Sequence, residues 1–189
     1  DYVGSLNEEK FRMLAELCKK PKTVVVGEIG LDYYWDNEPH EVQQKWFIRQ
    51  LELAGEVKKP VIIHSREAAA DTMYIMKNYA QGLDGVIHCY SYSREMAEEY
   101  VKMGFYIGIG GVVTFKNAKK LKDVAAAIPI EKIVLETDCP YMAPEPYRGK
   151  RNQSSYIRYV AEKIAELKEM NQEEVIAVTE KNARDLYGI

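Results

Sequence analysis

The sequence predicts an α/β protein with parallel strands, and two observations carry that prediction. Short runs rich in β-branched residues recur along the chain. Each run is continuously apolar rather than alternating, which is typical of strands buried on both faces of a parallel sheet. Amphipathic stretches with helical spacing lie between the runs. Strands that alternate with helices in this way indicate either a doubly wound sheet or a barrel.

Five strands and six helices are expected. The strands are expected at residues 23–29, 60–64, 85–88, 105–109 and 133–136. The helices are expected at residues 8–19, 41–57, 67–79, 94–103, 156–170 and 173–187. Ser93 and Asn171 are predicted N-caps, while Gly104 and Gly188 follow helix ends. Residues 139–155 form the one long irregular stretch, a length that favours a functional or a disordered loop.

Composition narrows the classes of protein that fit. The chain of 189 residues is expected to be a single domain, residues 1–189, with 47% hydrophobic and 29% charged residues. No apolar run is long enough to cross a membrane. A net charge of −3 excludes DNA binding by bulk electrostatics, so any nucleic-acid contact must be local. Three cysteines without a CxxC pair favour a reducing, cytoplasmic location.

Candidate metal ligands stand at the ends of four predicted strands: Glu28, His64, His88 and Asp138. Taken singly, each has a structural explanation: a hydrogen-bonded core histidine, a turn-capping aspartate, or a glutamate paired with an arginine such as Arg66. Taken together, they favour a metal site, because the C-terminal ends of barrel strands converge on one mouth. Two imidazoles and two carboxylates suit zinc, manganese or a similar divalent ion.

Other polar and small residues receive structural interpretations. His40 follows Pro39 among charged residues and is expected at the surface. Cys89 and Cys139 adjoin the candidate ligands, but strand alternation should turn them away, so both are interpreted as packing residues. The glycines of residues 108–111 lack a phosphate-loop pattern and indicate a crowded strand end, with a ligand role as the alternative.

Five segments in a fixed order resemble the TatD family of metal-dependent deoxyribonucleases. They are VVVGEIGLDYYW, PVIIHSREA, GVIHCYS, YIGIGGVVTFKNA and LETDCPYMAPEPYRGKRN. The resemblance extends from about Gly4 to Ile189 and includes the closing NARDLYGI. It implies a TIM (β/α)8-type barrel of the metal-dependent hydrolase kind, holding two divalent metal ions (Mg, Mn or Zn).

The resemblance also implies roles for individual residues. Glu28 matches the carboxylate that bridges two metals, and His64 and His88 match the histidines of one metal. Asp138 matches the aspartate of the other metal and the acceptor of the proton from the attacking water. Residues of the family motifs with an expected role in substrate orientation are Asp32, Ser65, Arg66, Arg148 and Arg151. The alternative for Arg148, Lys150 and Arg151 is a solvated loop.

The sequence departs from the family pattern at its start. The family's first strand ends in a His-x-His pair, and no such pair occurs here. A barrel of this type needs about 250 residues, so the chain is expected to hold only the last five βα units. It begins with Asp1 rather than Met, as expected of a chain entered partway or trimmed. Without the missing ligands, this chain is expected to have little nuclease activity.

The implied function is divalent-metal-dependent hydrolysis of phosphodiester bonds in DNA, with metal-bound water as the nucleophile. RNA remains open as a substrate, and neither a membrane nor an obligate protein partner is expected. One alternative is an amidohydrolase-type barrel acting on an ester, amide or lactone. Glu28 stands where such enzymes often carry a modified lysine, which favours the nuclease. The other alternative is an inactive truncated product.

Overall fold

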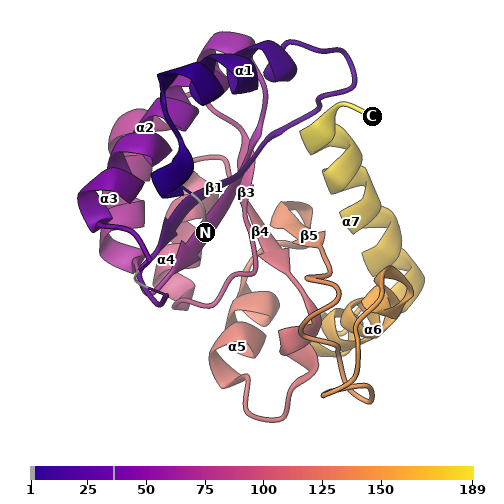
Figure 1. The fold of residues 1–189 in the computed structure, drawn as a ribbon. Helices are drawn as coiled ribbons and strands as arrows, with labels where there is room; N and C mark the ends of the chain where they lie inside the picture. The colour runs from indigo at the N-terminus through magenta and orange to yellow at the C-terminus, as the bar shows by residue number, and fades with distance from the viewer. Residues whose placement is uncertain (1–2, 36) are drawn as a thin grey trace. The chain divides into compact units, whose positions relative to one another are not determined.

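The computed structural model of the chain describes residues 3–35 and 37–189 (Figure 1). It divides into two compact units. Unit 1 contains the chain up to Val86 together with Gly188, and unit 2 contains Ile87–Tyr187 together with Ile189. The division falls within the short strand β3 (Gly85–Ile87), so each unit has its own strands and covering helices.

Unit 1 is built on the parallel pair β1 (Val26–Asp32) and β2 (Val61–Arg66). Ile29 pairs with Ile63 and Gly30 with His64 in the ladder. Most apolar side chains of both strands are buried, as the continuous apolar runs predict, and Ile62 is half-buried. On the other side of β2, its first residue, Val61, donates its backbone N–H to the carbonyl of Asp84, which immediately precedes β3.

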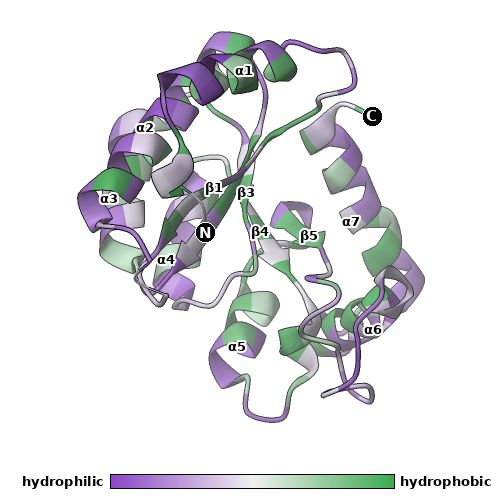
Figure 2. Ribbon diagram, viewed as in Figure 1, coloured by the Kyte–Doolittle hydropathy of each residue, from purple (hydrophilic) through white to green (hydrophobic). Residues whose placement is uncertain are grey.

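The helices of unit 1 are α1 (Glu8–Cys18), α2 (His40–Val57) and α3 (Ala69–Tyr79), preceded by the 3₁₀ turn η1 (Val3–Ser5). α2 packs against β1 and buries Trp46, Phe47 and Leu51, which lie on one face of the helix. α1 alternates hydrophobic and hydrophilic residues in Figure 2, as expected of a helix with one solvated face.

Unit 2 is built on the parallel pair β4 (Tyr106–Ile109) and β5 (Ile133–Leu135), with Ile107 paired to Ile133. The Tyr90 N–H, after β3, donates to the Gly108 carbonyl of β4. The helices are α4 (Arg94–Lys102), α5 (Lys119–Ala127), α6 (Ile157–Lys168) and α7 (Gln172–Tyr187). Three 3₁₀ turns join them: η2 (Gly111–Thr114), η3 (Ile130–Lys132) and η4 (Ser154–Tyr156).

The structure confirms the α/β class and the five predicted strands, with three differences in detail. β1 spans Val26–Asp32 rather than the predicted residues 23–29. α5 was not predicted, because its nine residues begin with lysines and bury only three side chains at helical spacing. β5 ends at Leu135, so Glu136 lies beyond the strand rather than within it. The predicted N-cap is confirmed at Ser93, whose hydroxyl accepts from the Met96 N–H. Within residues 3–35 and 37–189, no helix combines the length and apolarity needed to cross a membrane.

Candidate metal centre

Glu28 and His64 approach each other from the neighbouring strands β1 and β2. Glu28 was predicted at a strand end, but it is the third of the seven residues of β1 and so lies within the strand. The ladder register shifts between Val26 and Ile29, and this irregularity contains Glu28. Such irregularities re-aim side chains and are common beside active sites. Glu28 Oε1 lies 3.3 Å from His64 Nδ1, and the two side chains are 46% and 33% exposed. Both residues line a pocket of about 390 Å³ in unit 1.

Asp32 holds the other nitrogen of the His64 ring. Its Oδ2 lies 3.0 Å from Nε2. In the neutral tautomer that donates to Asp32 through Nε2, the lone pair is on Nδ1, the nitrogen that faces Glu28. Burial alone would lower the pKa of His64, but the hydrogen bonds and charges of Glu28 and Asp32 outweigh it, so the pKa is raised. The pocket therefore attracts positive charge at this imidazole.

The Glu28–His64 pair fits a divalent cation. Two ligand atoms that bind one tetrahedral ion at about 2.0–2.2 Å lie about 3.3 Å apart. The observed separation between Nδ1 and Oε1 is 3.3 Å. Metal-binding histidines also usually donate their second ring N–H to a carboxylate, as His64 does to Asp32. Two ligand atoms of unit 1 thus already lie at the separation that one ion requires.

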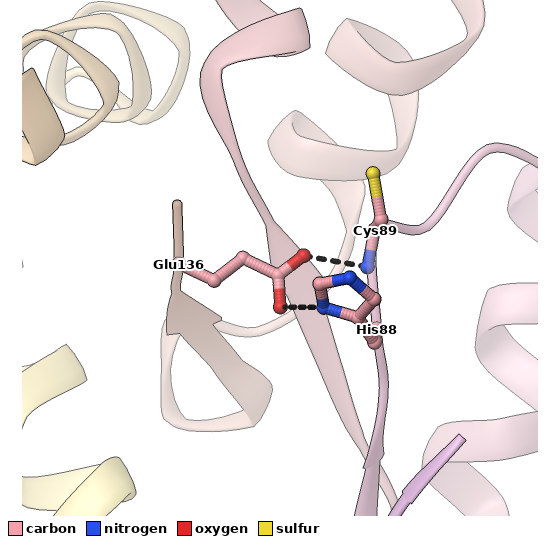
Figure 3. A group of neighbouring side chains, drawn as sticks. All are labelled: His88, Cys89 and Glu136. Atoms are coloured by element: carbon pink, nitrogen blue, oxygen red, sulfur yellow. Dashed lines mark hydrogen bonds and ion pairs between the residues drawn. The ribbon is translucent and has the colours of Figure 1, made fainter. Parts of the chain in front are cut away.

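In unit 2, a carboxylate oxygen of Glu136 contacts a ring nitrogen of His88 (Figure 3), as Asp32 contacts His64 in unit 1. Glu136 Oε2 lies 2.8 Å from His88 Nδ1, and the Cys89 backbone N–H donates to Oε1 at 2.5 Å. Both side chains are largely buried, at 16% and 17% exposure. The carboxylate favours the tautomer that donates through Nδ1, which makes Nε2 the nitrogen of His88 that could bind an ion.

Glycine at position 108 makes room for Glu136. A Cβ atom built there would lie 2.5 Å from Glu136 Oε2. At Gly111, a Cβ would lie 2.3 Å from the Met142 carbonyl oxygen. The prediction of a crowded strand end at residues 108–111 is therefore confirmed. Gly108 also bears on the candidate centre, since any side chain at that position meets the carboxylate that orients His88.

The two cysteines next to candidate ligands behave differently. Cys89 is half-buried with a φ of 47°, and together with His88 and Glu136 it could offer ligand atoms within 4.8 Å of one another. In Figure 3, however, its backbone nitrogen faces the carboxylate and its sulfur points away from it. Cys139 is exposed, so its interpretation as a packing residue was wrong. The chain turns directly after β5, where the Asp138 carbonyl accepts from the Tyr141 N–H at 2.7 Å, and strand alternation no longer applies.

The predicted substrate residues of unit 1 lie in different settings. Ser65 is buried, and its hydroxyl lies 2.8 Å from that of Thr72, a placement that favours a structural role. Arg66 is exposed, and its guanidinium lies 3.8 Å from the centre of the Tyr34 ring. His40 is exposed, as predicted, and stacks on Tyr33.

The loop that follows β5 in unit 2, residues 139–155, contains a buried asparagine that holds it. Asn152 donates to the Tyr141 carbonyl at 2.7 Å and is only 3% exposed. Arg148 and Arg151 are exposed, and Arg148 lies 4.3 Å from the centre of the Phe115 ring. Asn152 therefore ties together two parts of the loop after β5, and the arginines of this loop are exposed to solvent.

Each unit thus brings together part of the predicted site. Unit 1 groups Glu28, His64 and Asp32, and unit 2 joins His88 to Glu136. Glu136 was not predicted from the sequence as a site residue.

The chain matches the family model described as TatD related DNase over residues 1–188. It is 48% identical over 185 residues to the uncharacterized metal-dependent hydrolase YabD of Bacillus subtilis, a match that covers 97% of this chain and 72% of that protein. It is 32% identical over 182 residues to a protein of Escherichia fergusonii named 3'-5' ssDNA/RNA exonuclease TatD, covering 93% and 70% of the two chains.

Solved structures give the same result. The crystal structure of YjjV, a TatD homologue from Escherichia coli K12, matches with a TM-score of 0.92 at 30% identity, covering 99% of this chain and 73% of that one. A TatD family hydrolase from Entamoeba histolytica matches with a TM-score of 0.84 at 25% identity, covering 98% and 71%. The predicted fold class, an α/β architecture of the TIM-barrel metal-dependent hydrolase kind, is confirmed by these matches.

Proposed function

Because this chain belongs to the family of TatD related DNases and is a metal-dependent hydrolase, we propose that it hydrolyses phosphodiester bonds in single-stranded DNA with two divalent ions. The proposed metal ligands are Glu28, His64, His88 and Asp138. A relative whose name gives single-stranded DNA and RNA as substrates supports the choice of an unpaired strand. RNA is the second substrate to test.

One observation carries the proposal: both histidines are held by a carboxylate through one ring nitrogen. Asp32 holds His64 at 3.0 Å, and Glu136 holds His88 at 2.8 Å. A core histidine in a structural role can be satisfied by any hydrogen-bond partner. A carboxylate partner suits a ligand histidine in particular, because it fixes the tautomer and the ring orientation and raises the basicity of the other nitrogen.

The chain's own residues would divide the work of hydrolysis. Divalent ions, when bound, supply Lewis acidity and positive charge to the phosphodiester. Asp138 accepts the proton of the attacking water, while Asp32 and Glu136 keep the two imidazoles in place. Arg66 and the exposed arginines after β5 offer forked donors that suit phosphate oxygens. Local cations of this kind are consistent with a net charge of −3.

Metal binding by the chain is the first test. Calorimetric titration with Mn²⁺ or Zn²⁺ should give a dissociation constant that rises roughly 10–100-fold or more in Glu28→Gln and in His64→Asn, since each variant loses a ligand or weakens its neighbour. His40→Asn is the matched control, because His40 is exposed and stacks on Tyr33. Equal affinity in wild type and Glu28→Gln would contradict the proposed ligands.

Hydrolysis is the second test, made with the natural protein that carries this sequence. Labelled single-stranded DNA should be cleaved with Mg²⁺ or Mn²⁺ and spared when a chelator is present. Asp138→Asn is nearly isosteric and should fold, yet it should lower kcat by orders of magnitude, since it loses a ligand and the proton acceptor. Chelator-insensitive cleavage, or full activity in Asp138→Asn, would overturn the mechanism.

A further inference from the structure

We infer that Tyr34, Trp35 and Arg66 form a stacking subsite for an unpaired nucleobase beside the proposed ligands Glu28 and His64. The inference rests on the proposed function, because it assigns the base of the strand whose phosphodiester is cut. All five residues belong to unit 1. None of the three was interpreted as a base-binding residue from the sequence.

The aromatic pair is exposed and carries a cation. Tyr34 is 50% and Trp35 57% exposed, although large aromatic side chains are usually buried. Their rings meet edge to face, with centroids 5.0 Å apart and planes at 86°. The guanidinium of Arg66 lies 3.8 Å from the centre of the Tyr34 ring and 5.6 Å from that of Trp35. Aromatic rings and stacked guanidinium planes are the groups on which unpaired bases stack.

The pair lies next to the candidate ligands. Trp35 lines the same pocket of about 390 Å³ as Glu28, Asp32 and His64. A volume of this size falls in the range of small-ligand sites. A base held on the indole would therefore bring its neighbouring phosphodiester to the carboxylate and imidazole proposed to hold an ion.

The charge of this pocket favours stacking over electrostatic attraction. Three carboxylates line it, those of Glu28, Asp32 and Glu38. An anionic strand is repelled by them until cations bind, so charge alone does not hold the strand at this end. Base stacking is independent of that repulsion and tolerates any base sequence. The chemistry thus selects an unpaired nucleobase rather than a simple anion.

Hydrogen bonds fix the turn that carries the two rings. Asp32 Oδ1 accepts the backbone N–H groups of Tyr34 and Trp35 at 3.0 and 3.2 Å. The buried Gln43 donates to the carbonyls of Asp32 and Glu38 and accepts from the Asp32 N–H. The backbone of Tyr34 and Trp35 is thus held in place by Asp32, and such preorganisation lowers the entropic cost of binding.

Tryptophan fluorescence provides a direct test in the chain itself. The sequence has two tryptophans, and Trp46 is only 5% exposed, so Trp46→Phe leaves Trp35 as the single emitter. With chelator present to prevent hydrolysis, short oligothymidylate should quench this emission. An abasic oligomer of equal length, which keeps the phosphates, should not. Equal quenching by both oligomers would overturn the subsite.

A second measurement keeps Trp46 and so does not depend on that variant folding. Fluorescence anisotropy of a labelled oligothymidylate should show binding weakened about tenfold in Trp35→Ala and largely restored in Trp35→Phe, which keeps a ring. Tyr74→Ala, which removes a 65% exposed aromatic ring from α3, is the control and should bind as wild type does. Unchanged binding in Trp35→Ala would overturn the inference.

The two proposals fail in different ways. Base-dependent quenching without cleavage under any metal supports the subsite and contradicts the nuclease. Cleavage of DNA with the same KM in wild type and Trp35→Ala supports the nuclease and contradicts the subsite. A KM raised about tenfold in Trp35→Ala, on bases but not on abasic strands, supports both.

Discussion

One carboxylate oxygen of Glu136, Oε2, lies 2.8 Å from Nδ1 of the His88 ring. Its second oxygen accepts the Cys89 N–H, so the carboxylate cannot rotate without losing a bond. The imidazole is thereby held in one tautomer and one orientation, and the residue that does this lies just outside β5.

Glu136→Gln should weaken metal binding without removing a proposed ligand. The amide keeps the size of the side chain, but it carries no charge and offers only one acceptor oxygen where the carboxylate uses two. Second-sphere changes of this kind cost roughly 10–100-fold in metal affinity. Calorimetric titration measures the effect, and Glu131→Gln, which changes an exposed carboxylate of η3, is the control. Unaltered affinity in Glu136→Gln would show that the contact is structural only.

Gly108→Ala should also disturb the contact between Glu136 and His88. The new Cβ would lie 2.5 Å from Glu136 Oε2, so the carboxylate must move. We expect a loss of about 1–3 kcal/mol in the free energy of unfolding, as in other overpacked sites, together with weaker metal binding. Urea denaturation and metal titration check the two effects.

Gly55→Ala is the matched control for that substitution. Gly55 lies inside α2, and its Cβ would meet only Leu83, at 3.8 Å. Alanine should stabilise the helix by about 0.5–1 kcal/mol. If both variants change the free energy of unfolding in the same direction and by the same amount, the close contact at Gly108 does not affect stability.

Asn182→Ala should destabilise unit 2. The Asn182 amide is 5% exposed and donates to the carbonyls of Ile130 and Ile133, which ties α7 to the start of β5. Removal leaves two buried acceptors without this donor, at a cost of about 1–3 kcal/mol for an unsatisfied group. Asn78→Ala is the control, because Asn78 is exposed on α3 and donates to the Tyr74 carbonyl within its own helix. Urea denaturation should separate the two variants clearly.

Tyr33 makes stability depend on alkaline pH. Burial, together with Asp71 and against the effect of Gln44, raises its pKa to about 12. The unfolded phenol ionises near pH 10, so stability is full below about pH 10 and is lost as pH rises toward 12. Tyr33→Phe cannot ionise, so its deficit in unfolding free energy relative to wild type should shrink across this interval. A constant deficit across this range in urea denaturation would contradict the prediction.

The sequence was a good guide to the strands, and less so to the contacts around the site. Continuous apolar runs predicted the strands, because both faces of a parallel sheet are buried. Histidines are rare in this chain, so two at strand ends stood out. Glu136 and Trp35 did not stand out, because a carboxylate that holds an imidazole and an indole left exposed have no pattern along the chain.

Chain turns and short helices made other features hard to predict from the sequence. The interpretation of Cys139 assumed that strand alternation continued past the strand, but β5 ends at Leu135. α5 was missed because helical spacing over nine residues is a weak signal beside its lysines. The number and identity of the metals stay predictions, as do the roles of Asp138 and the arginines of its loop.

Asp32 is shared by two neighbours, and thermodynamics gives this sharing a consequence. One oxygen contacts the His64 ring, and the other accepts the N–H groups beneath Tyr34 and Trp35. An ion at the imidazole and a base on the indole would both act on that one carboxylate. By reciprocity, the factor by which the ion changes the affinity for the base equals the factor by which the base changes the affinity for the ion. The coupling between ion binding and base binding in unit 1 is therefore described by one factor. Titration with either ligand, in the presence and absence of the other, measures it.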